Sequence, residues 1–144
     1  GKGKTLGSIL EKGTVDKEFY IDNKELKDWE YLKGSKKIER TNTDGFKYIY
    51  SEGSMGFPDD ITKPSRTIIT GEGGPSPSRF KHLIKVKNKY RRLTPIELER
   101  LNMFPDNHTK LEGVTNTKRA FFMGNALVVG VVKKIGVSLY KLVK

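Results

Sequence analysis

The sequence contains no cysteine, only two histidines and one tryptophan among its 144 residues. Without cysteine, this chain has no disulfide, no thiolate metal ligand and no cysteine nucleophile of its own. The two histidines, His82 and His108, are far apart in the sequence and do not have the spacing of metal ligands, so we predict no metal site. No nucleophile, base and orienting acid occur at a spacing that indicates a hydrolase, and we predict no catalytic residue in this chain.

Long uninterrupted apolar runs are also missing. The longest apolar stretch, residues 126–143, is broken by Lys133, Lys134 and Gly136, and the N-terminus has no signal-peptide pattern. We therefore expect a cytoplasmic protein with no membrane partner. The chain begins at Gly1 rather than at methionine, which favours a fragment or an engineered polypeptide.

Acidic residues are scarce relative to basic ones. The chain has 17 Asp and Glu against 28 Lys and Arg, a formal net charge of +11. Such an excess favours a polyanionic partner, nucleic acid first and an anionic membrane second. With 31% charged and 35% hydrophobic residues, we expect one domain with a modest core, or a small domain with an extension that belongs to a neighbour.

The most informative stretch is 91–106, which predicts a short helix with a well-defined start. Thr94 is a good N-cap residue and Pro95 suits the first helical position. Glu97, three residues after Thr94, completes a capping box because its side chain can bond back to the cap. The helix must end before Pro105.

The same stretch resembles the ninth conserved motif of the DNA (cytosine-5) methyltransferases, Arg-x-Leu-Thr-Pro-x-Glu, then Arg-Leu, then Phe-Pro-Asp. Downstream, 123–129 resembles the tenth motif of that family, Gly-Asn-Ala-Val, although Phe122 and Met123 replace its usual polar residue. Two motifs in the family's order are a far more specific signal than either alone. The residues that match the ninth motif are Arg91, Leu93, Thr94, Pro95, Glu97, Arg100, Leu101, Phe104, Pro105 and Asp106.

The resemblance implies an α+β fold: a small, mostly-β target-recognition domain followed by helices. In the whole enzyme these helices pack on a Rossmann-like, S-adenosylmethionine-dependent methyltransferase domain. On this basis residues 1–13 are a linker from the catalytic domain, 14–90 are the target-recognition domain, and 91–144 hold the ninth-motif helix and the tenth-motif C-terminal helix. The C-terminal helix is expected to begin with Asn125 as its N-cap.

Local patterns place the elements of the middle region. Leu26, Trp29 and Leu32 lie at helical spacing, which favours a core position for the tryptophan over base stacking. An Asp-Gly turn signal at residues 44 and 45 predicts a hairpin whose second strand is 46–50. Two further strands are predicted, at 63–70 and 80–86.

DNA-contacting residues are expected in this middle region and just after it. The resemblance assigns Thr67 and Ile68 to the short signature that helps to hold the DNA backbone around the target cytosine. Arginine and lysine bridge guanine O6 and N7, although each such residue is more often a phosphate contact. Arg91 and Arg92 either brace the domain or contact phosphate. The complete set of expected DNA-binding residues is Lys36, Lys37, Arg40, Arg66, Thr67, Ile68, Gly73, Gly74, Arg79, Arg91 and Arg92.

The resemblance also implies the chemistry. The family uses a cysteine thiolate to attack carbon 6 of a flipped-out cytosine, and S-adenosylmethionine supplies the methyl group to carbon 5. Here Asn125 and Ala126 match the positions that contact this cofactor. Because the chain has no cysteine, we expect it to be the C-terminal part of a bacterial enzyme and to be inactive alone. Its expected partners are double-stranded DNA and an N-terminal catalytic domain or subunit, and its expected location is the nucleoid. The alternative is a stand-alone, non-catalytic basic nucleic-acid-binding module.

Overall fold

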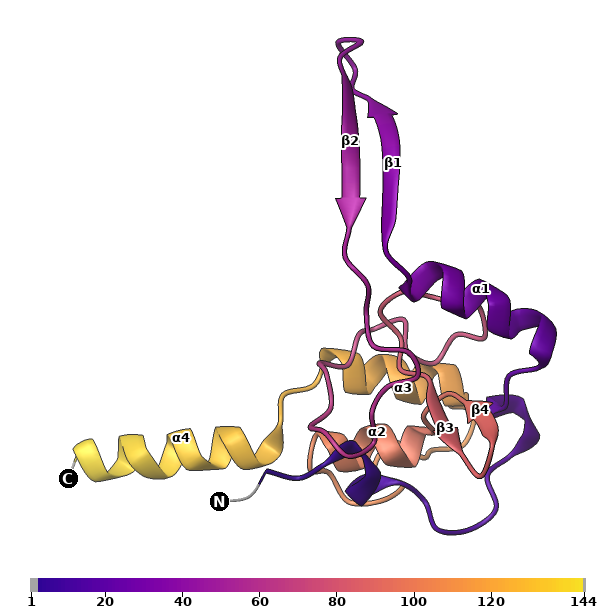
Figure 1. Ribbon diagram of the computed structural model, residues 1–144. Coiled ribbons are helices and arrows are strands. Elements are labelled where there is room, and N and C mark those ends of the chain that lie inside the picture. Colours follow the sequence, from indigo (N-terminus) through magenta and orange to yellow (C-terminus); the bar gives the residue numbers. More distant parts are fainter. Residues whose placement is uncertain (1–2, 144) are drawn as a thin grey trace.

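The computed structural model describes residues 3–143 and has an α+β fold, as predicted, with two small antiparallel sheets and four α-helices over that range (Figure 1). The sheets are β1 (Lys36–Thr41) with β2 (Lys47–Glu52), and β3 (Ile84–Val86) with β4 (Lys89–Arg91). The helices are α1 (Asn23–Lys33), α2 (Pro95–Leu101), α3 (Asn116–Asn125) and α4 (Val129–Leu142), and two short 3₁₀ turns, η1 (Leu6–Ile9) and η2 (Lys17–Phe19), precede them.

The capped helix predicted from the sequence is α2. The Thr94 hydroxyl accepts a hydrogen bond from the backbone N–H of Glu97 at 3.2 Å. The Glu97 carboxylate accepts one from the backbone N–H of Thr94 at 3.0 Å, so both halves of the capping box are present. The prediction for this helix is confirmed.

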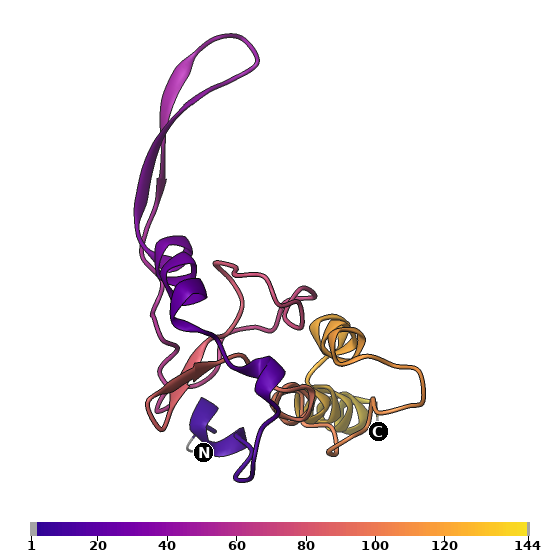
Figure 2. The same cartoon turned by 90° about the vertical axis from the view of Figure 1, so that its right-hand side faces the viewer.

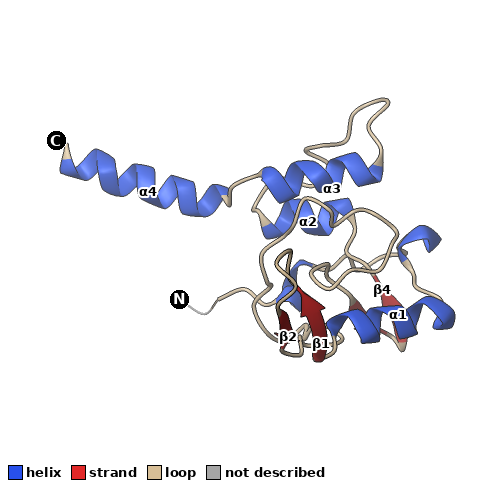
Figure 3. Cartoon of the chain, turned by 90° about the horizontal axis from the view of Figure 1, so that it is seen from above, coloured by secondary structure: helices blue, strands red, loops and turns tan. Residues whose placement is uncertain are grey.

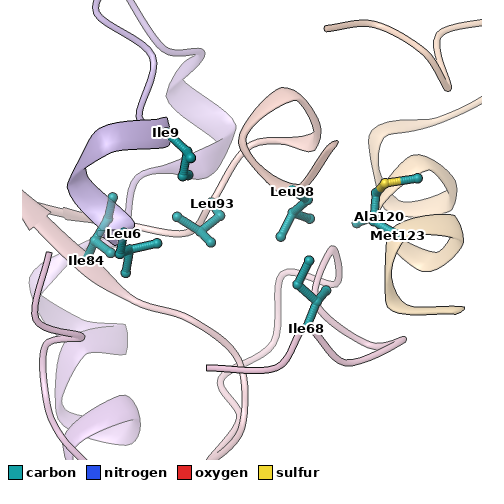
Figure 4. Close-up of a cluster of buried hydrophobic side chains, with 8 residues drawn as sticks. All are labelled: Leu6, Ile9, Ile68, Ile84, Leu93, Leu98, Ala120 and Met123. Carbon is teal, nitrogen blue, oxygen red and sulfur yellow. The ribbon is translucent and has the colours of Figure 1, made fainter. Parts of the chain in front are cut away.

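The hydrophobic core lies between α2, α3, η1 and the loop before residue 70. The segment 3–13 contributes to this core, because η1 places Leu6 and Ile9 in it. The backbone N–H of Glu11 also donates to Glu97 at 2.9 Å. Figure 4 shows the eight buried side chains of this cluster: Leu6, Ile9, Ile68, Ile84, Leu93, Leu98, Ala120 and Met123.

Two elements project from this body (Figures 1 and 2). The hairpin β1–β2 extends away from the core, with Gly45 in its connecting loop at a φ of +81°. Helix α4 extends in another direction and has no buried residue (Figure 3). The predicted hairpin is confirmed, and so is the core position of Trp29, which is fully buried in α1.

Two strand predictions need correction. Residues 63–70 form no strand, since they pair with no other strand. Ile68 instead packs in the core, and the backbone N–H of Ile69 donates to the Glu72 carboxylate at 3.4 Å. The predicted strand 80–86 is reduced to β3. The backbone N–H groups of His82 and Leu83 donate to carboxylates rather than to a neighbouring strand.

The start of the last helix was also predicted wrongly. Asn125 is the final residue of α3, and its side-chain amide donates to the carbonyl of Phe121 at 3.1 Å. The helical path is interrupted at residues 126–128 and resumes as α4, whose N-cap residue, Val128, provides no side-chain cap. The domain boundaries drawn at residues 13 and 90 stay a prediction.

Candidate functional site

A pocket of about 340 Å³ lies between the loop that carries Thr67 and the junction of α3 with α4. It brings together segments about sixty residues apart in the sequence, the two to which the sequence motifs assign DNA and cofactor contacts. Ala126 lines the pocket, whereas Asn125 does not. The lining residues are Ser65, Arg66, Thr67, Ile68, Leu101, Asn102, Met123, Gly124, Ala126, Leu127 and Val128.

Close backbone packing holds the two walls of this pocket together. A Cβ on Gly124 would lie 2.5 Å from Thr70 Cα, so only glycine allows α3 to approach the loop this closely. The buried side-chain amide of Asn102 donates to the backbone carbonyl of Met123 at 2.8 Å, and the backbone carbonyl of Asn102 accepts from the N–H of Val129 at 3.0 Å. Asn102 therefore ties the end of α2 to both sides of the helix break.

A buried hydrogen-bonded chain fixes the start of the loop. Ser65 Oγ lies 3.0 Å from His82 Nε2, and His82 Nδ1 lies 2.8 Å from Glu72 Oε1. His82 and Glu72 are 1% and 2% exposed. A serine, histidine and carboxylate in this order can serve nucleophilic catalysis, but here Ser65 Oγ also donates to the carbonyl of Arg66 at 2.8 Å, so its proton is bonded to the chain itself. The arrangement positions the loop ahead of Thr67.

Arg66 is held by a second, partly buried network. Its Nε donates to Asp59 Oδ1 at 2.8 Å, and its terminal nitrogens donate to the carbonyls of Phe80 and Lys81. Burial raises the pKa of Asp59, but the hydrogen bonds from Arg66 and from the Leu83 N–H outweigh it and hold that pKa below its usual value. Lys33 Nζ lies 3.6 Å from Asp59, and burial lowers the pKa of this lysine.

Arg91 and Arg92 lie inside the protein, which favours the bracing role over phosphate contact. Arg91 is 2% exposed and donates to both carboxylate oxygens of Glu97, at 2.8 and 2.7 Å. Arg92 donates to the carbonyls of Gly73 and Glu18, at 3.0 and 2.7 Å, and burial lowers the pKa of its guanidinium.

The loop that carries the predicted DNA-binding residues Gly73, Gly74 and Arg79 is likewise packed against the body. A Cβ on Gly73 would lie 2.6 Å from Ala120 Cβ, and one on Gly74 would lie 3.2 Å from Lys81 Nζ. The close approach that glycine permits here is therefore to α3 and to a lysine of the chain. Arg79 donates to the carbonyls of Leu32, Gly34 and Gly53 and forms an ion pair with Glu52 at 3.2 Å, which anchors the base of the hairpin.

The hairpin carries the remaining predicted DNA-binding residues. Lys36, at its base, lies over the ring of Tyr31 and is paired with Glu52 at 3.8 Å. Lys37 and Arg40 are exposed. The guanidinium carbon of Arg40 lies 4.0 Å from the centre of the Tyr50 ring.

Sequence reasoning missed two features of this site. The convergence of Ser65, Glu72 and His82 has no signal in the sequence, because the three residues are separated by loops. The sequence likewise does not indicate that Lys33 is completely buried. Among the described residues 3–143, no group of three or more histidine, cysteine or acidic side chains is placed to hold a metal ion.

Comparison with known proteins gives two matches. A sequence model of the family described as C-5 cytosine-specific DNA methylase matches residues 1–141. The chain is also 45% identical over 141 residues to the Type II methyltransferase M.Sau3AI of Staphylococcus aureus. The alignment covers 98% of this chain and 33% of that relative, so the chain spans about a third of the length of the curated relative it matches.

Proposed function

The chain belongs to the C-5 cytosine-specific DNA methylase family, and from this premise we propose that it is the DNA-recognition part of a DNA (cytosine-5) methyltransferase. In this role it is the C-terminal part of the enzyme and positions a flipped cytosine for methyl transfer from S-adenosylmethionine. The name of the S. aureus relative supports a Type II restriction-modification system, in which a cytoplasmic enzyme acts on the nucleoid DNA.

The observation that carries this proposal is the shared pocket. The loop with Thr67 and Ile68 and the α3–α4 junction with Ala126 match different motifs of the family, one for the DNA around the target base and one for the cofactor. These segments line one pocket. Methyl transfer needs the base and the cofactor side by side, and a pocket lined by both segments supports this proposal.

S-adenosylmethionine fits the pocket only in part. About 340 Å³ is at the small end of the range for ligand sites, and Arg66 is the only charged side chain in the lining. The cofactor has an amino group, a carboxylate and ribose hydroxyls, which need more polar partners than this wall supplies. We therefore assign Ala126, which lines the pocket, and the adjacent exposed Asn125, which lies outside it, to one side of the cofactor site, with the rest supplied by the catalytic part. When bound, the cofactor donates the methyl group.

Helix α4 is the surface on which we propose that the catalytic part docks. None of its residues is buried, although most are apolar; examples are Val132, Ile135 and Leu139, which are 48%, 62% and 60% exposed. An apolar surface of this length needs a protein or lipid partner.

Residues 116–142 are also long and apolar enough to cross a membrane by length and composition. However, α3 contributes Ala120 to the core and buries Arg119 beside Glu99 at 3.0 Å, and the helix is broken at 126–128. A segment with these features is a poor membrane span. A protein partner is therefore the better occupant of α4, and we propose the N-terminal catalytic domain or subunit.

The test is methyl transfer from labelled S-adenosylmethionine to duplex DNA. The chain alone is expected to incorporate no label, because it has no cysteine to attack carbon 6 of cytosine. Adding a polypeptide that holds the family's cysteine and cofactor loop is expected to produce incorporation. Enzyme-like incorporation by the chain alone, or none by the two together, would contradict the proposal.

The net charge of +11 favours one alternative, a stand-alone basic module that binds nucleic acid without catalysis. Tight binding by the chain alone, falling steeply with salt and unaffected by the catalytic part, would support it. The exposure of α4 argues against this alternative, because an independent module would cover its own apolar helix.

A further inference from the structure

We propose that Arg40, held on the ring of Tyr50, reads a guanine in the major groove, and that the hairpin β1–β2 is the element that enters the groove. This inference rests on the proposed function, since it names the residue through which this chain selects its DNA site.

Six of the seven arginines in the chain have their guanidinium groups bonded to the protein itself. Arg66, Arg79, Arg91 and Arg92 are bound as described above. The other two are Arg100, which donates to both carboxylate oxygens of Asp106 at 2.8 and 2.6 Å, and Arg119, which donates to Glu99 at 3.0 Å. These groups stabilise the fold and are not available to a ligand without breaking it.

Arg40 is different. Within residues 3–143 its guanidinium donates no hydrogen bond and forms no ion pair, and it is exposed on β1. In this part of the chain its close contact is the ring of Tyr50, 4.0 Å from the guanidinium carbon, and Glu52 on the same face attracts it electrostatically. A cation stacked on an aromatic ring is held in place while its N–H groups remain free at the edge. Arg40 is thus an oriented donor without an acceptor.

The hairpin has the shape for major-groove binding. Each strand has six residues, which corresponds to about 20 Å, and the pair projects from the body as a ribbon (Figures 1 and 2). A two-stranded ribbon fits the major groove of B-form DNA. An isolated hairpin is marginally stable in water, so its projection is most readily explained by a partner that supports it.

The two faces of the hairpin differ in composition. Arg40 is opposite Tyr48 in the strand register, and Ile38 is opposite Tyr50, so these four side chains share one face. Glu39 and Lys47 belong to the other face, where they pair at 3.2 Å. The Arg40 face also carries a carboxylate, Glu52, but this group lies at the base of the hairpin, where it pairs with Lys36 and Arg79. Farther out on this face, the guanidinium of Arg40 lies between aromatic and apolar groups. The Arg40 face therefore faces the bases.

Guanine is the base that this group fits. Guanidinium presents parallel N–H donors, and guanine offers two adjacent acceptors, N7 and O6, in the major groove. Stacking on Tyr50 fixes the plane of the guanidinium, which reduces the rotamer freedom lost on binding.

The experiment uses the complete methyltransferase that contains this chain. Its recognition sequence is first obtained by mapping methylated cytosines on a randomised duplex pool. Binding to that site is then measured with each guanine replaced in turn by 7-deazaguanine, which lacks the N7 acceptor. For the wild-type enzyme, we expect one position at which the replacement weakens binding about 5- to 150-fold. For Arg40→Ala, the replacement at that position should have no effect.

Matched variants separate base reading from general electrostatics. Lys37→Ala also removes one positive charge from β1, but it should weaken binding equally at all sequences and keep the 7-deazaguanine effect. Arg40→Lys keeps the charge and should reduce the effect, because an ammonium can donate to N7 and O6 but has no planar fork of donors that stacks on Tyr50. Tyr50→Phe retains the ring and should retain the effect, whereas Tyr50→Leu should reduce it. Unchanged thermal melting of each variant shows that the body is folded.

The possible failures are distinguishable. If the wild-type enzyme methylates no defined sequence, the proposed function fails. If it is specific but Arg40→Ala keeps the same 7-deazaguanine profile, or if no guanine responds, only the assignment of Arg40 fails. A uniform loss of affinity for Arg40→Ala, equal to that of Lys37→Ala, would make Arg40 a phosphate contact and overturn the inference.

Discussion

The buried ion pair between Arg91 and Glu97 gives the sharpest prediction about stability. Both groups are almost fully buried, and the Glu97 carboxylate also accepts from the backbone N–H groups of Thr94 and Glu11 at 3.0 and 2.9 Å. Replacing Glu97 by Ala leaves a buried guanidinium without its counter-charge and two backbone donors without an acceptor. Removing one partner of a buried pair costs about 3–5 kcal/mol.

This loss is a large share of the stability of a typical domain, about 5–15 kcal/mol. The assay is urea denaturation of the chain followed by tryptophan fluorescence, since Trp29 is fully buried in α1. With a slope of about 2 kcal/mol per molar urea, Glu97→Ala should lower the midpoint by roughly 2 M.

Two further variants make the reasoning falsifiable. Glu39→Ala breaks an exposed pair with Lys47, whose side chains are 65% and 72% exposed, and should leave the midpoint unchanged within error. The double variant Arg91→Met with Glu97→Leu removes both charges and should recover part of the loss. If the urea midpoint of Glu97→Ala lies within roughly 0.5 M of the wild-type midpoint, the shift is far smaller than a buried ion pair implies. That result would refute the bracing role of Arg91.

Three other predictions follow from the packing. Gly73→Ala should destabilise the chain by about 1–3 kcal/mol, because its Cβ would lie 2.6 Å from Ala120 Cβ, whereas Gly53→Ala, with no atom within 4 Å, should melt normally. Burial raises the pKa of Glu99, but hydrogen bonds from Thr109 and the ion pair with Arg119 outweigh it and hold the pKa below the ordinary 4.5. The resulting stabilisation is present above pH 4.5 and is lost as the pH falls through the lower pKa of the folded state. Glu99→Gln should therefore flatten the acid side of a curve of unfolding free energy against pH, measured by urea titration. Ile135→Asp should leave the melting temperature unchanged, because nothing in α4 is buried, and should abolish methyl transfer in the complementation assay.

Local rules predicted the parts of the fold that depend on neighbouring residues. The Thr94 cap, the turn at Gly45 and the burial of Trp29 each follow from residues a few positions apart, and all three are present. The family motifs point to Thr67 and Ala126, and both line one pocket, while their contacts with DNA and cofactor stay a prediction.

The errors arose where distant side chains replaced local partners. Residues 80–83 have strand-like composition, but Glu72 and Asp59 capture the N–H groups of His82 and Leu83 and end the strand there. Composition cannot reveal this, because the capturing carboxylates come from other loops. The break before α4 is similar, since Asn102 bonds to the backbone on both sides of it.

The distribution of arginine partners explains why the sequence alone could not rank the DNA-binding candidates. All of the candidate arginines carry the same charge, and each could bridge guanine. Their difference is the number of protein acceptors that the fold brings to them, which is several for Arg66, Arg79, Arg91 and Arg92 and none within residues 3–143 for Arg40. Because a guanidinium that is bonded inside the protein must exchange those bonds to bind DNA, its net gain from a base is small. A basic residue of such a domain is therefore a strong base-reading candidate only when the fold leaves its donors unpaired and still fixes its orientation, and the stacking of Arg40 on Tyr50 meets both conditions.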